Sequence, residues 1–310
     1  MELSLEHFSS IAPHVGTPRT LIQMSSGFSN DNYILTTSQS KYRVRVSKYS
    51  KHTDELLAEQ LILSRAAEQH NLIVPMLRLF RLPNGTNVSI FPYLEADLNF
   101  DINNEELMRD AGKALAHYHL SVDGYTGSLP WKPLSEAFGH EVLQAGELSK
   151  FIDDQALLEY PNLWCSIESL LQRMEDANVL MNEEPCSLLP QLPCHGDFAP
   201  ANLLTHGNRI TGMIDFECCR WAPRLYDLST FLISLQEDEG FEMDMSTWFL
   251  EGYNSVLPLS ENELKLIPKF QYIRSLEAAK RHFIRVLNGD HRMHFGLIMY
   301  WERVTIDLRK

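Results

Sequence analysis

The sequence predicts an α+β fold in which a small antiparallel sheet with one helix precedes a larger, mainly helical part. Strand-like alternation of apolar and polar residues dominates residues 21–91. Beyond residue 105 apolar residues recur mostly at helical spacing, and residues 91–95 lead from the last predicted strand into this part. We therefore expect an N-terminal lobe of residues 1–95 with five antiparallel strands, and a C-terminal lobe of residues 96–310.

Length and composition describe an ordinary globular protein. The 310 residues are 44% hydrophobic and 22% charged, which suffices for two lobes and a sizeable core. No apolar run approaches the roughly 18 residues that a membrane span requires, and the N-terminus lacks the pattern of a secretion signal. The cysteines are odd in number, and Cys218 and Cys219 are adjacent, which favours reduced thiols. These features predict a cytoplasmic protein with no membrane partner.

The charge is acidic and unevenly distributed. The chain carries a formal charge of −14, yet residues 1–95 hold nine Lys/Arg against eight Asp/Glu, so the excess acid lies in the remainder. A nucleic-acid partner would need a basic face, and we expect none. The excess acid has two interpretations: a solvated surface that keeps the protein soluble, or a field that attracts a cationic small molecule.

Three strands are predicted near the N-terminus. Residues 21–37 have the pattern of a hairpin, and residues 41–48 that of a third strand in which β-branched and basic residues alternate. The polar turn of the hairpin contains a glycine, which would let the backbone approach a phosphate, although such a turn commonly has no function beyond the hairpin. Its phosphate-binding candidates are Ser26, Gly27, Ser29 and Asn30.

The third strand and the next helix together predict a buried ion pair. Arg43 and Arg45 alternate with valines, so both guanidinium groups point to the opposite sheet face, where one could enter a cleft. Residues 54–69 have helical spacing, and their apolar positions leave Glu59 available to pair with a strand arginine. Those apolar positions are Leu57, Leu61 and Leu63. A buried Arg–Glu pair would fix the basic group for contact with phosphates, whereas an exposed glutamate is the plain alternative.

Two further strands complete the predicted sheet. Residues 71–91 have the pattern of two strands with a turn at residues 83–85. In a nucleotide-binding cleft, the following connection would offer a carbonyl and an amide to the adenine edge. Pro92 can supply only its carbonyl, so Leu94 is the better candidate for the amide donor.

The rest of the chain is predicted to be largely helical. Residues 105–122 form a clear amphipathic helix with His117 and His119 near its end, where we expect the histidines to have a structural role. Further helices are expected within residues 134–160, 162–180, 226–236, 245–257 and 262–287.

The stretch of residues 192–228 concentrates acid, amide and histidine side chains among short apolar runs. A hydroxyl that attacks a phosphate needs an acceptor for its proton, and Asp197 suits this task. Magnesium prefers carboxylate or amide oxygens, which Asn202 and Asp215 would supply. Residues 203–214 have the pattern of a hairpin, which would bring these two side chains to its open end. This residue chemistry predicts a magnesium-dependent enzyme of phosphate chemistry.

The motifs HGDFAPANLL and IDFE in this stretch resemble those of the aminoglycoside phosphotransferase and choline kinase family. Upstream, SSGFSN resembles the family's nucleotide-covering loop, YRVRVS its strand with the phosphate-contacting basic residue, LLAEQLIL its helix with the paired glutamate, and FPYLE its hinge. YDLS resembles its downstream aspartate motif. The resemblance spans residues 21–230 and implies a bilobal protein-kinase-like fold and a small-molecule kinase that uses ATP and Mg.

The resemblance also implies roles for individual residues. Asp197 matches the catalytic base, and Asn202 and Asp215 match the metal ligands. Arg45 matches the basic phosphate contact, although several family members have lysine at this position, and Glu59 matches its partner. Of the other residues near these motifs, Asp227 matches an acid that supports the catalytic loop, Glu217 either assists a second metal or caps the loop, and Arg224 has no assigned role.

We therefore expect a phosphotransferase that moves the γ-phosphate of ATP to a hydroxyl of a small, amino-bearing molecule. An aminoglycoside, an amino alcohol or a hydroxylated amino acid would fit. Residues 1–95 would bind the nucleotide, and residues 96–310 would hold the catalytic groups and the acceptor. An acidic segment supplies candidates for ammonium recognition, with a solvated loop as the alternative: Glu237, Asp238, Glu239 and Glu242.

Two functions of other classes remain open. One is a nucleotide-binding pseudokinase that acts as an interaction module, which the joint presence of Asp197, Asn202 and Asp215 disfavours. The other is a protein kinase. It would need a long activation segment, yet only about a dozen residues separate Asp215 from Asp227.

Overall fold

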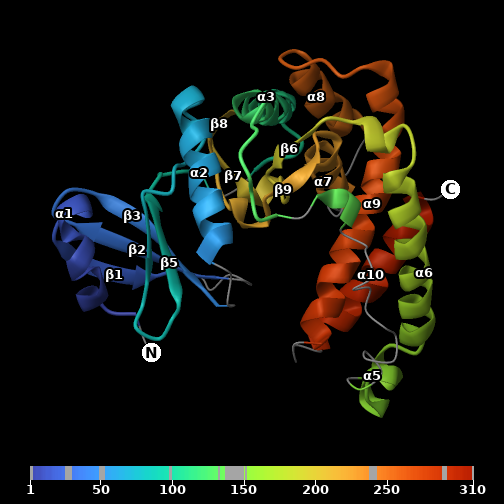
Figure 1. The fold of residues 1–310 in the computed structure, drawn as a ribbon, viewed down its shortest axis with the longest axis horizontal. Coiled ribbons are helices and arrows are strands. Elements are labelled where there is room, and N and C mark those ends of the chain that lie inside the picture. Colours follow the sequence, from blue (N-terminus) through green and yellow to red (C-terminus); the bar gives the residue numbers. More distant parts are fainter. Residues whose placement is uncertain are drawn as a thin grey trace. The chain divides into compact units, whose positions relative to one another are not determined.

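The computed structural model describes residues 3–24, 30–48, 53–97, 100–131, 133–136, 150, 152–236, 243–287 and 292–308. The chain forms two units, each assembled from separate segments (Figure 1). The first unit consists of Met1–Trp131, Pro200–Glu217 and Thr247–Leu257, and the second of Lys132–Ala199, Cys218–Ser246 and Pro258–Lys310. The functional division at residue 95 that the sequence suggests stays a prediction.

The first unit contains the predicted five-stranded antiparallel sheet. Its strands lie in the order β1 (Pro18–Gln23), β2 (Asn30–Thr37), β3 (Lys41–Ser47), β5 (Asn87–Pro92) and β4 (Arg78–Arg81). The turn between β4 and β5 contains Gly85 at a φ of 87°, which glycine adopts without a steric cost. Residues 71–77 lie outside the sheet strands, although the sequence pattern includes them in the fourth strand.

The two faces of this sheet differ in chemistry. Alternate residues of the central strands, such as Leu35, Val44 and Ile90, form a hydrophobic core with short N-terminal helices. These are η1 (Leu5–Ile11) and α1 (Ala12–Val15), which contribute Phe8, Ile11 and Val15 to the core. The opposite face carries Arg43 and Arg45 and lies towards α2 (Thr53–Gln69) (Figure 1). The alternation of the strand therefore places two basic groups on one side.

The buried face of α2 differs from the predicted one. Leu57 and Leu61 are 50% and 51% exposed, whereas Leu63 is buried as expected. The buried stripe instead runs through Leu56, Glu59, Leu63 and Ala66 at spacings of three and four residues. The two exposed leucines are four residues apart and form a second apolar stripe, so the sequence pattern alone did not distinguish the stripes.

A helix and a hairpin complete the first unit. The N-cap residue Asn104 accepts a hydrogen bond from the Leu107 amide at the start of α3 (Glu105–Val122). The predicted hairpin is present as β7 (Leu203–His206) and β8 (Arg209–Met213). The carboxylate of Asp110 on α3 accepts a hydrogen bond from the Ile210 amide at 2.8 Å, which fixes the hairpin against this helix.

Two glycines let α8 (Met243–Asn254) pack closely on α3. A Cβ atom on Gly112 would overlap the carbonyl oxygen of Phe249, and one on Gly252 would overlap that of Arg109. Beside this contact, the ring of His119 hydrogen-bonds the Tyr253 hydroxyl at 2.8 Å, and both residues are buried.

The second unit is mainly helical, as predicted. Its long helices α6 (Leu163–Asn182), α9 (Glu261–Leu287) and α10 (Arg292–Leu308) lie side by side (Figure 1). The sequence did not predict α10, and of the helices expected in residues 134–160 the described residues contain η2 (Leu134–Glu136) and α5 (Asp154–Glu159).

A short strand pair in this unit was not predicted either: β6 (Gln191–Cys194) pairs with β9 (Arg220–Pro223), which leads into α7 (Leu225–Gln236). None of the described helices is long and apolar enough to cross a membrane.

Candidate active site

Arg45 and Glu59 form the expected buried ion pair. The guanidinium donates from Nη1 to Oε1 at 2.9 Å and from Nη2 to Oε2 at 2.7 Å, and both residues are 2% exposed. Burial lowers the pKa of Arg45, but the charge and hydrogen bonds of Glu59 outweigh this effect, and the net pKa is raised. The guanidinium also lies over the Phe91 ring at 5.1 Å. The basic group is therefore permanently charged and rigidly held.

Asp215 lies beside this pair, directly after β8. Its Nη1–Oδ1 separation from Arg45 is 3.7 Å, and its backbone has a φ of 69°, a region that aspartate tolerates better than most residues. Burial and the nearby charge of Glu217 raise the pKa of the Asp215 carboxyl against the opposing effect of the two arginines of β3. Its buried Oδ1 has no hydrogen-bond partner within the described residues. A buried carboxylate oxygen in this condition suits a cation.

The hairpin brings Asn202 and Asp215 to its open end. The Ile214 amide donates to the carbonyl of Asn202 at 3.0 Å, one residue before Asp215. A small cavity of about 20 Å³ lies next to Asp215 and is lined by Arg43, Arg45 and Glu59 among others. One predicted metal ligand and the predicted phosphate contact are thus neighbours in the first unit.

The loop expected to cover the nucleotide is described at only one of its candidate residues. Ser26, Gly27 and Ser29 lie outside the described residues. The side-chain Nδ2 of Asn30, the first residue of β2, donates to Oε2 of Glu217 at 2.7 Å. This bond gives Glu217 a partner close to the predicted phosphate-binding turn.

The predicted hinge begins inside the sheet. Phe91 and Pro92 still belong to β5, where Pro92 pairs with Tyr42, and the Tyr93 amide donates to the Lys41 carbonyl at 3.2 Å. Leu94 follows outside the strand with a 36% exposed side chain.

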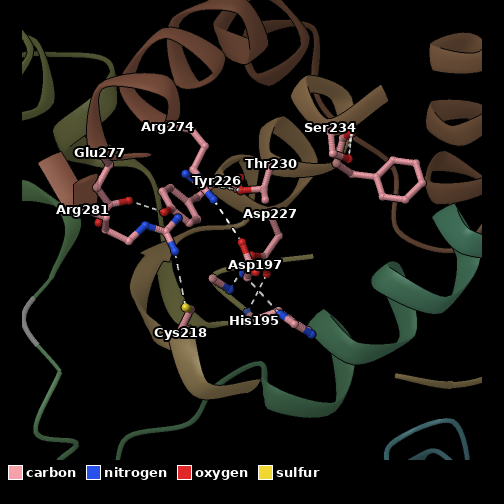
Figure 2. A network of polar contacts seen from close by, with 12 residues as sticks. His195, Asp197, Cys218, Tyr226, Asp227, Thr230, Ser234, Arg274, Glu277 and Arg281 are labelled. Carbon is pink, nitrogen blue, oxygen red and sulfur yellow. Dashed lines mark hydrogen bonds and ion pairs between the residues drawn. The ribbon is translucent and has the colours of Figure 1, made fainter. Parts of the chain in front are cut away.

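In the second unit, a buried carboxylate holds the loop that carries Asp197. Asp227, in the first turn of α7, accepts hydrogen bonds from the backbone amides of His195 at 2.7 Å and Gly196 at 2.9 Å (Figure 2). Gly196 has a φ of 83°, and a Cβ there would overlap the carbonyl of Cys218. The His195 ring accepts from the Asp197 amide at 3.3 Å. The loop that carries Asp197 is therefore fixed through its backbone.

Asp197 also contacts an arginine that the sequence did not reveal. Nη2 of Arg274, in the middle of α9, lies 3.1 Å from Oδ1 of Asp197 (Figure 2). Nε of Arg274 donates to the Thr230 hydroxyl at 3.0 Å, and its guanidinium lies 5.8 Å from the centre of the Tyr226 ring. In the sequence, the one feature that could have pointed to Arg274 is a basic residue that directly follows Ile273 in a largely apolar stretch of this helix.

Other charged residues of this unit brace the elements around the loop. Glu277 of α9 pairs with Arg220 of β9 and accepts a hydrogen bond from Tyr226. Arg224, to which the sequence assigned no role, donates to both carboxylate oxygens of Glu263 at 2.6 and 2.8 Å. These contacts connect β9 and α7 to α9 and are structural.

The site residues therefore fall into two groups, and each group belongs to one unit. Arg45, Glu59, Asn202 and Asp215 belong to the first unit and Asp197 to the second. The acidic candidates of residues 237–242 lie outside the described residues. The chemical roles of all these residues stay predictions.

Comparisons with known proteins identify the family. Residues 20–259 match the model of the phosphotransferase enzyme family. The chain is 26% identical to a homoserine kinase of Rhizobium johnstonii over 87% of its own length and 80% of that protein. It is 24% identical to a homoserine kinase of Phenylobacterium zucineum over 92% of its own length and 84% of that protein. It is 28% identical to a homoserine kinase of Gluconobacter oxydans over 52% of its own length, and this match spans about half, 48%, of that relative.

Solved structures confirm the predicted bilobal protein-kinase-like fold. The amicoumacin kinase hAmiN, in complex with AMP-PNP, Ca²⁺ and Ami, superposes with a TM-score of 0.71 at 14% identity, over 93% of this chain and 88% of that chain. A Plasmodium vivax ethanolamine kinase superposes with a TM-score of 0.64 at 14% identity, over 96% of this chain and 85% of that chain. At these identities the likeness shows the fold alone. Because the family model covers most of the sequence, this chain belongs to the phosphotransferase enzyme family and is a small-molecule kinase that transfers phosphate to an alcohol group.

Proposed function

We propose that this kinase uses ATP and Mg²⁺ to phosphorylate the hydroxyl of a small, amino-bearing acceptor, and that a hydroxylated amino acid is the best candidate. Several relatives that align over most of the chain are homoserine kinases, and homoserine has an amino group, a carboxylate and a primary hydroxyl. The observation that carries the proposal is that Asp197 combines an accessible side chain with a fixed backbone. Its side chain is 39% exposed, while the buried Asp227 fixes the backbone of its loop.

In this proposal the first unit binds the nucleotide. Arg45, held by Glu59, contacts the phosphates, and the turn that ends at Asn30 covers them. The connection after β5 contacts the adenine edge through the carbonyl of Pro92 and the amide of Leu94. The permanent charge of Arg45 and its two hydrogen bonds to Glu59 support this role, because a fixed cation needs no reorganisation when a phosphate arrives.

Asn202 and Asp215 would hold the metal ion. The buried Oδ1 of Asp215, which has no hydrogen-bond partner within the described residues, and the hairpin that joins the two residues support this assignment. Bound magnesium would supply charge neutralisation between the nucleotide phosphates. Asp197 would orient the acceptor hydroxyl towards the γ-phosphorus and take its proton as the new P–O bond forms.

The experiment that tests this proposal is a coupled assay of acceptor-stimulated ADP release. We would assay L-homoserine, L-serine, ethanolamine and an aminoglycoside with ATP or GTP, with and without Mg²⁺. We expect Mg²⁺-dependent release of ADP with a hydroxylated amino acid, and a phosphorylated product detectable by ³¹P NMR. Tight binding of ATP without turnover on any acceptor would instead indicate a pseudokinase.

A further inference from the structure

One nitrogen of the Arg274 guanidinium has no hydrogen-bond partner in the described part of the chain. Arg274 is 6% exposed, its Nε donates to Thr230, and its Nη2 donates to Asp197. Nη1 is buried and has no partner among the described residues. Figure 2 shows the guanidinium reaching from α9 towards the loop of Asp197. The unused donor therefore belongs to the same fixed group that already contacts the predicted catalytic base.

A charged donor left unsatisfied in the interior is costly, because the group has lost its hydration without replacement. Burial and the nearby charge of Arg281 lower the pKa of Arg274, so its surroundings disfavour the cation. A bound anion would satisfy Nη1 and would offset this repulsion. The arrangement suits a ligand that carries an oxyanion and lies beside Asp197.

The charge around Asp197 contrasts with that of the whole chain. Arg281 lies two helical turns beyond Arg274 and donates to Sγ of Cys218 at 3.4 Å, so both arginines point to the side of α9 that faces the loop (Figure 2). The chain carries a net charge of −14, yet its described contacts beside Asp197 include a buried arginine. A purely cationic acceptor would meet repulsion here, whereas a zwitterion can present its carboxylate.

We propose that Nη1 of Arg274 binds the carboxylate of the acceptor, which makes Arg274 a specificity-determining residue for hydroxylated amino acids. The inference rests on the proposed function. With Nη2 on Asp197 and Nη1 on the substrate carboxylate, one rigid guanidinium fixes the distance between the base and the acceptor. An amino alcohol or an aminoglycoside offers no carboxylate and leaves the donor unsatisfied.

The same nitrogen could bind an oxyanion from another source, namely a nucleotide phosphate. The two sources differ in what the loss of Arg274 does. Loss of a carboxylate contact weakens the binding only of acceptors that carry a carboxylate. Loss of a phosphate contact weakens the binding of ATP, whichever acceptor is used. An effect transmitted through Asp197 lowers the turnover of all acceptors equally, so it cancels in the ratio of the kcat/KM values of two acceptors.

The test compares L-homoserine with 3-amino-1-propanol, which is homoserine without its carboxylate. In the wild-type protein we expect kcat/KM for homoserine to exceed that for the amino alcohol by about 100-fold or more. In Arg274→Gln this preference should fall by about 100-fold, mainly through the KM of homoserine. The KM of ATP should stay within about threefold of wild type, and Arg274→Lys should retain part of the preference.

Arg303→Gln provides the matched control, since it removes the same charge from an exposed position of the second unit. It should leave the preference unchanged. Comparable wild-type turnover of both acceptors would overturn the inference without any variant, which keeps the test decisive if the buried substitutions impair folding. Equal losses for both acceptors in Arg274→Gln, with or without a raised KM for ATP, would overturn it too. A wild-type protein that phosphorylates neither acceptor would instead contradict the proposed function.

Discussion

The guanidinium of Arg45 holds the carboxylate of Glu59 through two hydrogen bonds of 2.9 and 2.7 Å, with both side chains almost fully buried. Removing one partner of such a pair leaves the other charge in the interior without compensation. Glu59→Gln should therefore lower the free energy of unfolding by about 3 kcal/mol, as measured by urea denaturation. Glu68→Gln, at an exposed position of the same helix, should change it by less than about 0.5 kcal/mol. Equal effects of both substitutions would show that the buried ion pair contributes no more to the free energy of unfolding than an exposed glutamate does.

Gly196 combines a positive φ with a close approach to the carbonyl of Cys218, and these two constraints can be separated. Gly124 also has a positive φ, of 63°, but a Cβ atom there would have no atom of the described residues within 4 Å. Gly124→Ala should cost about 1 kcal/mol through backbone strain alone. Gly196→Ala should cost more, because the loop must also move, and it should lower kcat by at least about tenfold. Thermal denaturation of both variants measures the loss of stability, and steady-state kinetics measures the loss of kcat. Wild-type kcat in Gly196→Ala would contradict a fixed loop.

The proposed metal site should destabilise the protein when no metal is bound. Asp215 combines a φ of 69°, the nearby charge of Glu217 and a buried carboxylate oxygen that accepts no hydrogen bond from any described residue. Asp215→Asn removes the charge and keeps a side chain that tolerates this backbone conformation. We expect a Tm higher by a few degrees in EDTA and a loss of the Mg²⁺ dependence of ADP binding, measured by scanning and titration calorimetry. Unchanged Mg²⁺-dependent binding would remove Asp215 from the set of ligands.

A pair of stacked histidines predicts acid sensitivity. Burial, together with the nearby charges of His294 and Arg285, lowers the pKa of His282 to about 3. Below the unfolded pKa of about 6.5, the unfolded chain binds a proton that the folded chain does not, so stability falls as the pH decreases from about 6.5 towards 3. His282→Gln should show a shallower loss of Tm between pH 7 and pH 5 than wild type. His206→Gln, whose side chain is 81% exposed, should follow the wild-type curve. Parallel curves for all three proteins would exclude His282 as the cause.

Much of the fold followed from patterns that act over short distances. Alternation along β3 correctly separated Val44 from the two arginines, and the pattern of residues 203–214 correctly predicted the β7–β8 hairpin. The pattern was misleading on α2, where Leu57 and Leu61 have helical spacing but lie in solvent. Burial there depends on which side of the helix the sheet covers, and that is tertiary information.

The site was predictable where motifs were contiguous and not where packing assembled it. The sequence HGD marks the loop of Asp197, and the downstream YDLS marks Asp227. Arg274 lies 77 residues after Asp197 and belongs to no motif, so only the packing of α9 against the loop reveals it. The pairing of Arg224 with Glu263 was hidden for the same reason.

The most direct test of the central claim is the single-turnover rate of Asp197→Asn with ATP, Mg²⁺ and L-homoserine. The substitution keeps the shape of the side chain but removes its carboxylate, the proposed acceptor of the hydroxyl proton. If Asp197 is the base of a small-molecule kinase, the rate of phosphoryl transfer should fall by about 10³-fold, while the Kd of ADP stays within about threefold of wild type. A rate within tenfold of wild type would contradict the account.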